Sequence, residues 1–583
     1  ANILPLPAAR KLYTNNGSSD LTQPTNWLSV ANILSFTAAD FGLTGAAGDP
    51  TLTQIIDWAR GMDVRDNDSD GDTTEARNAM GDTLHAQPAA VVYGQTDGSY
   101  DVVIYTATNN GYLHAINADT GEEEWAFVPY ELLDNLGALY FNDNVNYKNY
   151  GLDGDVVPVV YDDNNDGVID TSDDFVYLVF GMRRGGDNYY MIEVTDPDKP
   201  KLRWVRSFPE MGQSWSPPVV AKIDIDSSIH TSPQDAVVIV GAGYDTVHDA
   251  PDHPDEVDGE GTGIMMLDLE TGDRIWRVGP DTAADLKLDK MTRSIPGRIR
   301  VVDMNGDGLA DRMYSADLGG QLWRFDIKNG EKPDTLVAGG VIARLGAEGL
   351  SAPTEADTRR LYTTPDVAVF TDKAQNRRYI SVSLGSGYRA HPLDNDAEDR
   401  FYSIRDPHIF NSLTQAQYNS YDIIEDDDLT EVSGEYGTVI PANGDGWKLT
   451  LPPDEKVLSD SQTFDNSVYF VTMEPTVDSI DPCQAGLSVN RLYRVDVVNG
   501  DPVIDYGTTV PTDPADIDAA RVTKLEQGGI APKPQFFFPS PVDPNCTGDA
   551  CAPPPVACVG VECFDPGFPN WPVRTLWTQD GIE

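Results

Sequence analysis

Short apolar stretches that alternate with polar residues dominate the chain, and turn residues separate them. Four of these stretches are predicted strands: Val156–Tyr161, Phe175–Phe180, Ile299–Val302 and Leu322–Ile327. Helical periodicity is rare, since only Leu52–Arg60 (LTQIIDWAR) has a helical pattern. The pattern therefore predicts an all-β protein with a short helical lead-in.

A repeated unit recurs through the chain, and it consists of an apolar strand, an acidic or amide residue and a chain reversal. Two copies also place a tryptophan four residues after the glycine, at Trp125 and Trp276. Complete and degenerate copies end at Gly121, Trp204, Gly272, Gly330, Asp406 and Gly500. A glycine at this position can adopt a positive φ and turn the chain into a hairpin. Such units cannot bury their faces alone, so they must stack around an axis or along a line.

The length and the repeats together predict one β-propeller with additions at both ends. A chain of 583 residues exceeds the usual size of a single compact core. The copies are spaced by roughly 60–90 residues, more than an ordinary blade needs, so the blades must carry long insertions. We expect a lead-in at 1–80, a propeller at 81–540 and a Pro/Cys-rich tail at 541–583, whose final strand could close the ring.

One predicted metal site is the loop between two strands at residues 303–311. Its oxygen-bearing side chains have the 1, 3, 5, 9 spacing of a cation-binding loop, with a glycine at the sixth position, and the Leu309 carbonyl takes position 7. The side-chain ligands are Asp303, Asn305, Asp307 and Asp311. Hard oxygen donors favour Ca²⁺ over a thiophilic metal. The alternative is a solvated Asp/Asn/Gly turn, and the missing carboxylate at position 12 excludes a full EF-hand.

The best match to a calcium loop lies between Val156–Tyr161 and Phe175–Phe180. Its predicted ligands are Asp162, Asn164, Asp166, the Val168 carbonyl, Asp170 and Asp173. The spacing is that of an EF-hand loop, except that aspartate replaces the longer glutamate at position 12. Strands flank the loop, so the helices of an EF-hand are absent.

Two further acidic loops give weaker predictions. Asp66, Asp68 and Asp70 alternate before a glycine, and Glu75 could complete a calcium shell; the alternative is a mobile acidic loop. Asp224 and Asp226 start a similar pattern that fails after Ser228.

The charge restricts the possible partners of the protein. The sequence has 94 acidic and 41 basic residues, a formal net charge of −53. Such an excess repels nucleic acid and anionic membrane surfaces, and bound cations or salt would relieve it. No run of about 18 apolar residues occurs, so no segment is expected to span a bilayer.

Five cysteines agree with an oxidising compartment. Cys546 and Cys551 are five apart, as are Cys558 and Cys563, while Cys483 stands alone. We expect two disulfides with one thiol left over, or pairing to a missing part of the chain; the connectivity stays open. The spacing does not favour zinc. The first residues contain neither an initiator Met nor a signal sequence, so we expect a processed or excised portion of a longer secreted protein.

No sequence motif indicates an enzyme. There is no GxSxG, HExxH or P-loop pattern. His248, Asp249, Asp252 and His253 could hold a transition metal, but a surface loop is the favoured interpretation. We therefore predict no catalytic residues.

The order of several segments resembles the C-terminal domain of the PilC/PilY-type type IV pilus tip adhesins. These are MGDTLHAQPAAVVYG, NNGYLHAINADTGEEEWAFVP, DMNGDGLADRMYSADLGGQLWRFDI, LGSGYRAHPLDNDAEDRFYSIRD and the terminal VRTLW. The resemblance runs from about Arg10 to Trp577. It implies a modified seven-bladed β-propeller with calcium in an extracellular loop, which falls on Asp303, Asn305, Asp307, Leu309 and Asp311.

The resemblance also implies a location and partners. The chain would lie outside the cell after passage through the periplasm, at the tip of a retractable pilus beside minor pilin subunits. Calcium would favour pilus extension and surface attachment, and its loss would favour retraction. Two alternatives come from other classes: a quinoprotein propeller dehydrogenase that binds pyrroloquinoline quinone and Ca²⁺, and a glycan-binding extracellular propeller.

Overall fold

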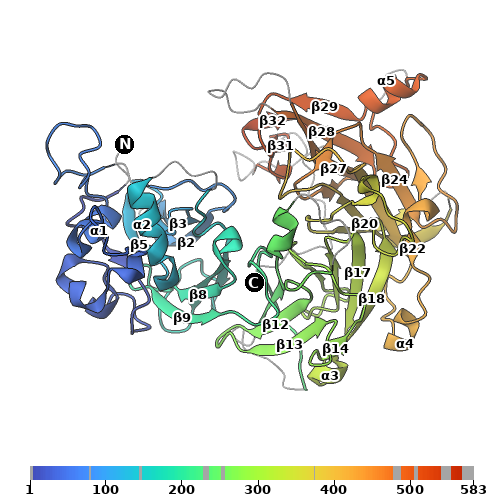
Figure 1. The fold of residues 1–583 in the computed structure, drawn as a ribbon. Helices are drawn as coiled ribbons and strands as arrows, with labels where there is room; N and C mark the ends of the chain where they lie inside the picture. Colours follow the sequence, from blue (N-terminus) through green and yellow to red (C-terminus); the bar gives the residue numbers. More distant parts are fainter. Residues whose placement is uncertain are drawn as a thin grey trace.

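The protein is a seven-bladed β-propeller with a few short helices, as expected (Figure 1). The computed structural model describes residues 4–77, 80–96, 98–142, 148–226, 236–250, 257–372, 375–476, 488–504, 510–539 and 553–567. The expected closing segment VRTLW and three of the five cysteines, Cys483, Cys546 and Cys551, lie outside these ranges.

Seven sheets follow one another along the chain, and we number them as blades 1 to 7. Blade 1 contains β2 (Ala89–Thr96), β3 (Ser99–Ala107), β4 (Leu113–Asn117), β5 (Glu123–Phe127) and β1 (Leu12–Tyr13). Blade 2 contains β6 (Val156–Tyr161), β7 (Phe175–Gly181), β8 (Tyr189–Glu193) and β9 (Lys201–Arg206). Blade 3 contains β10 (Val219–Ala221), β11 (Val237–Gly241), β12 (Ile264–Asp268), β13 (Arg274–Gly279) and β14 (Leu286–Lys287). The strands predicted at Val156–Tyr161 and Phe175–Phe180 are thus confirmed.

The remaining blades keep the antiparallel order of their main strands but carry longer insertions. Blade 4 contains β15 (Arg300–Val302), β16 (Arg312–Ala316), β17 (Gln321–Ile327), β18 (Val337–Arg344) and β22 (Ile424–Glu425). Blade 5 contains β19 (Asp366–Asp372), β20 (Arg377–Gly385), β21 (Arg400–Asp406), β24 (Gly446–Thr450) and β23 (Thr430–Glu431). Blade 6 contains β25 (Lys456–Val457), β26 (Gln462–Phe464), β27 (Ser467–Pro475), β28 (Ser488–Asp496) and β29 (Val522–Leu525).

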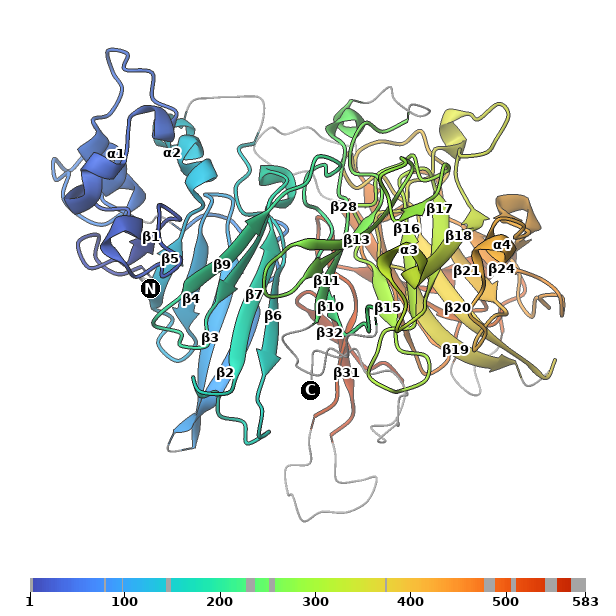
Figure 2. The ribbon, with the colours of Figure 1, turned by 90° about the horizontal axis from the view of Figure 1, so that it is seen from below.

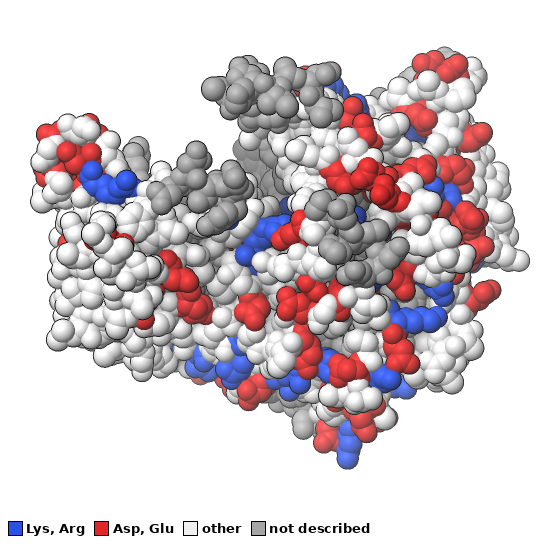
Figure 3. All heavy atoms as spheres, viewed as in Figure 1, with Lys and Arg blue, Asp and Glu red and all other residues white. Residues whose placement is uncertain are grey.

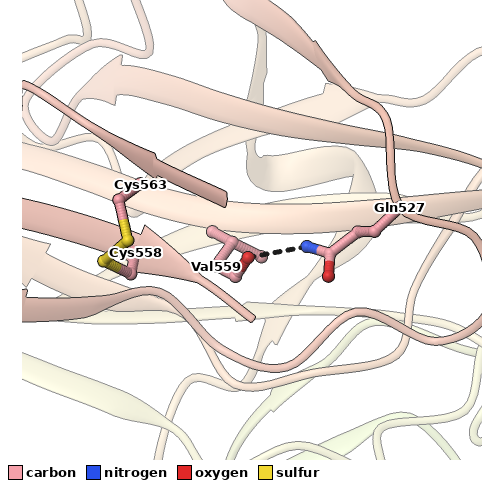
Figure 4. Close-up of a disulfide and its surroundings, with 4 residues drawn as sticks. All are labelled: Gln527, Cys558, Val559 and Cys563. Atoms are coloured by element: carbon pink, nitrogen blue, oxygen red, sulfur yellow. Dashed lines mark hydrogen bonds between the residues drawn. A yellow bond between two sulfur atoms is a disulfide. The ribbon is translucent and has the colours of Figure 1, made fainter. Parts of the chain in front are cut away.

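Blade 7 contains β30 (Gln535–Phe537), β31 (Val556–Val559) and β32 (Glu562–Phe564). A disulfide joins Cys558 on β31 to Cys563 on β32, and beside it the Gln527 side chain donates to the Val559 carbonyl at 2.7 Å (Figure 4). Strands β31 and β32 lie beyond residue 540, so part of the expected tail segment pairs within this sheet. The division into lead-in, propeller and tail otherwise stays a prediction.

The helices are short and lie outside the sheets. They are α1 (Leu52–Ala59), α2 (Leu133–Phe141), α3 (Pro333–Leu336), α4 (Gln415–Tyr418) and α5 (Pro514–Ala519). The first matches the predicted Leu52–Arg60, and a capping box formed by Thr51 and Gln54 starts it. Within the described ranges, no helix is both long enough and apolar enough to cross a bilayer.

All six copies of the repeated unit fall on the third strand of a blade, from blade 1 to blade 6. In blades 2, 3 and 6 the tight turn that follows this strand contacts the blade before it. In three blades a tryptophan on the fourth strand donates its indole N–H to a carbonyl in the next blade's turn: Trp125 to Pro197, Trp204 to Leu269 and Trp447 to Val497, at 2.7–3.0 Å. The repeat therefore encodes contacts between blades as well as strands within them.

The glycine of the repeat is required for two reasons. Gly121, Gly272, Gly330 and Gly500 all have φ between 69° and 91°, as the sequence predicted. A Cβ on Gly272 would also lie 2.7 Å from Cδ2 of Trp204, closer than van der Waals contact allows. The indole ring of Trp204 can thus pack against the turn of blade 3 only because Gly272 has no side chain.

The lead-in packs on blade 1 through one apolar core and one buried ion pair. Strand β1 pairs in parallel with β5, and lead-in residues share a hydrophobic cluster with blade 1. Arg10 donates to both carboxylate oxygens of Glu123, at 2.7 and 3.0 Å, and His114 lies 2.6 Å from the same carboxylate. Burial acts to raise the pKa of Glu123, but the His114 hydrogen bond and the Arg10 charge lower it to about 2.

Substituting Gly272 by alanine tests the contact between blades 2 and 3. Gly45 has a similar φ, +77° against +69°, but a Cβ at Gly45 would have no atom within 4 Å. We expect Gly45→Ala to cost about 1 kcal/mol from backbone strain alone. Gly272→Ala should lower the thermal unfolding midpoint clearly further because it also displaces Trp204. Equal shifts in the two variants would contradict the tight seating of this tryptophan.

Acid titration tests the ion pair that attaches the lead-in. Because the folded-state pKa of Glu123 is lowered from 4.5 to about 2, its stabilisation is present above about pH 4.5 and is lost as the pH falls toward 2. The shift corresponds to about 3 kcal/mol. We expect Glu123→Gln to destabilise the protein at pH 7 and to have little effect near pH 2, measured by urea unfolding. Glu122→Gln, at the exposed neighbouring position, serves as the control, and a loss independent of pH would refute the assignment.

Candidate metal-binding loops

Both of the better calcium-loop predictions occupy the same position in their blades. Residues 162–174 join β6 to β7, the first two strands of blade 2, and residues 303–311 join β15 to β16, the first two strands of blade 4. Loops between first and second strands emerge on one face of a propeller, which we call the acidic-loop face. In Figure 2 these connections lie along the lower side of the molecule.

The loop at 303–311 is folded around its predicted ligands. Asp303 accepts hydrogen bonds from the backbone N–H groups of Gly306 and Gly308, at 2.7 and 2.8 Å. Asn305 accepts from the N–H of Asp307, and Asp307 accepts from that of Leu309. These bonds turn the oxygen-bearing side chains at positions 1, 3 and 5 toward the inside of the loop. Asp311 closes it, because its carboxylate accepts from the N–H of Met304 at 2.7 Å.

The loop at 162–174 repeats this pattern with one difference at its end. Asp162 accepts from Gly167, Asn164 from Asp166 and Asp166 from Val168, each at 2.8 Å. The side chain that closes the loop is Asp174, which accepts from the N–H of Asp163 at 2.8 Å, as Asp311 accepts from Met304.

The three aspartates at the end of this loop, Asp170, Asp173 and Asp174, have different environments. Asp170 binds its own turn, accepting from the N–H of Ser172, and Asp173 is exposed. Asp174 is buried and also accepts from the N–H of Asp170. The assignment of Asp170 and Asp173 as ligands stays a prediction, and Asp174 joins them as a candidate that spacing had missed.

The weaker prediction at residues 66–75 has the same internal bonds. Asp66 accepts from the N–H of Gly71 at 3.0 Å, and Asp68 and Asp70 each accept from the N–H two residues on. One carboxylate oxygen each from Asp66, Asp68 and Asp70 lie within 4.8 Å of one another.

A second group here includes a buried residue that the sequence did not single out. Asp63 joins Asp68 and Glu75 in a set whose oxygens also lie within 4.8 Å of one another. Asp63 is 3% exposed. The nearby charges of Asp70 and Asp68 raise the pKa of Glu75 above its usual value. The carboxylates of this loop thus repel one another.

Backbone conformation is common to all three loops. The sixth positions, Gly71, Gly167 and Gly308, have φ of 91°, 78° and 86°. The fourth positions, Ser69, Asn165 and Gly306, also have positive φ, at 62°, 53° and 79°. Two left-handed residues so close together bend the chain sharply enough to bring alternate side chains to one centre.

Two of these loops contain buried oxygens that no described group satisfies. Asp162 Oδ1 and Asp63 Oδ1 are buried and accept no hydrogen bond from the described residues. In the third loop, burial and the charges of Asp307 and Asp303 raise the pKa of Asp311. An unsatisfied buried carboxylate oxygen costs free energy, and a hard cation would supply the missing partner. The residues present therefore fit Ca²⁺.

Each of the two better loops also contacts the preceding blade through its eighth residue. The N–H of Ile169 donates to the Tyr93 carbonyl on β2 of blade 1, at 3.0 Å. The N–H of Ala310 donates to the Lys222 carbonyl, just after β10 of blade 3, at 2.8 Å. A change in either loop can therefore reach the adjacent blade directly.

The remaining metal candidates are not assembled among the described residues. Asp224 and Asp226 lie in the loop after β10, but Ser228 falls outside the described ranges, as do Asp252 and His253. The expected surface loop around His248 is wrong in one respect: His248 is 3% exposed, and its Nε2 lies 2.9 Å from the Asp258 carboxylate. His248 and Asp258 both belong to the insertion between β11 and β12, and their contact buries the imidazole ring.

Comparisons with known proteins agree with the resemblance seen in the sequence. No known family model matches the chain. The type IV pilus biogenesis factor PilY1 of Pseudomonas aeruginosa is 24% identical over 94% of this chain. A PilY1 homolog of Xylella fastidiosa is 23% identical over 65%. The chain spans about half the length of the Pseudomonas protein, 50%, and 29% of the Xylella one.

A solved structure supports the same relationship at the level of the fold. The crystal structure of the Pseudomonas aeruginosa PilY1 C-terminal domain matches with a TM-score of 0.51 and 18% identity, covering 79% of this chain and 91% of that domain. The sequence similarity extends over nearly the whole chain, and the structural match shows that the propeller fold is shared. The chain is thus a homologue of the PilY1 type IV pilus biogenesis factors, with a propeller that matches the PilY1 C-terminal domain.

Proposed function

We propose that this propeller is the calcium-binding, adhesive domain of a pilus-tip protein, located outside the cell and without enzymatic activity. The observation that carries the calcium assignment is the hydrogen-bonding pattern that loops 162–174 and 303–311 share at positions 1 to 7, in equivalent positions of two blades. The pilus assignment is supported by the relatives, which are named as type IV pilus biogenesis factors.

The loops supply a physical mechanism for sensing calcium. Each loop gathers carboxylates whose mutual repulsion loosens it, in a chain of net charge −53. Bound Ca²⁺ neutralises that repulsion and fixes the ligand oxygens. In a calcium-bound loop the backbone N–H of the eighth residue stays hydrogen-bonded to the preceding blade. The contacts between blades 1 and 2 and between blades 3 and 4 are then more stable.

This coupling gives calcium a route to pilus behaviour. Extracellular calcium modules typically bind at about 10⁻⁴–10⁻³ M, a range that environmental calcium crosses. We propose that the ordered state favours pilus extension and surface attachment beside minor pilins, and that loss of calcium favours retraction. The acidic-loop face is where the two states would differ most.

Removing one carboxylate from each better loop tests the calcium sites. We expect Asp166→Ala and Asp307→Ala each to lower the stoichiometry of calcium binding by one ion, and the double variant by two, because each loop forms a separate site. Isothermal titration calorimetry on chelator-treated protein measures this. Asp334→Ala, at an exposed position in α3, is the control. Unchanged stoichiometry in both single variants would remove the basis for the proposal.

The closing residue of loop 162–174 gives a sharper test. Asp174 bridges the two ends of the loop, whereas Asp173 is exposed. We expect Asp174→Asn to weaken calcium binding at this site about tenfold or more, and Asp173→Asn to change it less than twofold. The measurement is a calcium titration in the Asp307→Ala background, which removes the site in loop 303–311. The reverse order of effects would favour the EF-hand spacing over the observed geometry.

A further inference from the structure

A cavity of about 310 Å³ lies where the seven blades meet. Its lining includes the segments that lead into the first strands β2, β6, β10, β15, β19 and β30 of six blades, and in blade 6 the segment between β25 and β26. None of the lining residues belongs to the three acidic loops. First strands begin at the end opposite to their connections with second strands, so the cavity opens toward the face opposite loops 162–174 and 303–311.

The charge of this cavity is the reverse of the charge of the chain. Basic side chains outnumber acidic ones in its lining, which contains Arg183, Arg298, Arg389, Lys533, Asp155 and Asp460. Figure 3 views the side of the molecule opposite the acidic-loop face, and a group of Lys and Arg side chains lies near its middle. Basic groups gathered at the axis repel one another and lose hydration, which is a cost that needs an explanation.

The two acidic residues of the lining are already engaged. Asp460 accepts from the N–H and hydroxyl of Thr364, at 2.8 and 3.1 Å. Asp155 accepts from the N–H of Gln87 at 3.1 Å and pairs with Arg298 at 3.6 Å. Just behind the wall, buried Asp153 lies 2.7 Å from Nδ1 of His85 and 3.4 Å from the Arg183 guanidinium.

Four side chains of the lining can donate further hydrogen bonds. The only hydrogen-bond partner of the Arg389 guanidinium among the described residues is the Leu458 carbonyl, although the charges of Asp460 and Asp155 also act on it. Lys533 has no hydrogen bond or ion pair there. The hydroxyls of Tyr362 and Ser459 are buried and make no hydrogen bond within the described part of the chain. Tyr362 is 7% exposed, so water reaches its ring poorly. A buried donor without a partner costs free energy.

The basic groups also disturb one another. Burial and the neighbouring Arg389 charge lower the pKa of Arg183 to about 10. Arg183 has a positive φ of 50°, which is rare for a residue with a side chain, and its guanidinium lies 4.2 Å from the centre of the Trp215 ring. Arg183 thus combines backbone strain with an unfavourable interaction between its charge and that of Arg389, at one wall of the cavity.

We propose that the central cavity binds a small oxyanion, a molecule that carries a carboxylate or phosphate group. With His85 neutral and Asp153 included, the site carries one positive charge in excess, which one anionic group would balance. Guanidinium groups suit the planar oxygens of such a ligand, and the two free hydroxyls add neutral donors. The volume is at the lower end for ligand pockets, which indicates a small molecule rather than a polymer.

Calorimetry with two anions tests the site. Succinate and inorganic phosphate are titrated separately into calcium-free protein, at an ionic strength held constant with sodium chloride. We expect saturable binding of at least one anion with a stoichiometry near one. Arg389→Gln should weaken it about tenfold or more, the loss expected for one charge-assisted hydrogen bond, and Tyr362→Phe should weaken it severalfold. Binding of succinate alone would identify the ligand as a carboxylate, and of phosphate alone as a phosphate.

Two further variants keep the result interpretable. Arg203→Gln removes an arginine of β9 that pairs with Glu193 outside the cavity, and it should leave anion binding unchanged. If Arg389→Gln does not fold, Lys533→Gln is judged by the same criterion, since Lys533 is half-buried at the cavity wall. No saturable binding of either anion, or an affinity that survives these substitutions, would overturn the proposal. The proposed calcium sites in loops 162–174 and 303–311 are unaffected by either outcome, because these loops lie on the other face.

Discussion

The contact between one blade's tryptophan and the next blade's turn is the interaction on which the structure most depends. A blade of a propeller cannot bury both of its faces alone, so the ring holds only if each blade fits its neighbour. Here Trp125, Trp204 and Trp447 each donate to a carbonyl in the following turn, and a glycine such as Gly272 leaves the space that the indole ring needs. One short sequence pattern thereby specifies a strand, a reversal and an interface.

The two faces of the ring also differ in charge. Loops 162–174 and 303–311 project from the acidic-loop face, and the axial cavity collects arginines toward the other face. Each better loop is bonded to the preceding blade through Ile169 or Ala310. The conformation of each loop is therefore linked to the neighbouring blade through a backbone hydrogen bond, and the proposed calcium response rests on this link.

The blades and the acidic loops could largely be predicted from the sequence because each depends on a short local pattern of residues. The repeat located the third strands of six blades, and the Asp/Asn/Gly spacing located loops whose internal bonds are local. Asp174 was missed because the twelve-residue spacing of an EF-hand loop ends at Asp173. In the structure the loop extends to Asp174, the residue before β7, and the side chain of Asp174 points into the loop.

Long-range features could not be predicted in the same way. The cavity draws its lining from all seven blades, and Arg183, Arg389 and Tyr362 are far apart in the sequence. The burial of His248 against Asp258 likewise depends on how one insertion folds back. Such sites have no local signature, since their chemistry arises only when the ring is complete.

The most direct measurement is anomalous X-ray diffraction from crystals of this chain grown in calcium and soaked with a lanthanide such as Tb³⁺. We expect one peak inside loop 162–174, in contact with Asp162, Asp166 and Asp174, and one inside loop 303–311, in contact with Asp303, Asp307 and Asp311. Well-ordered loops with no peak in either one at saturating metal would contradict the central claim that these connections are cation sites.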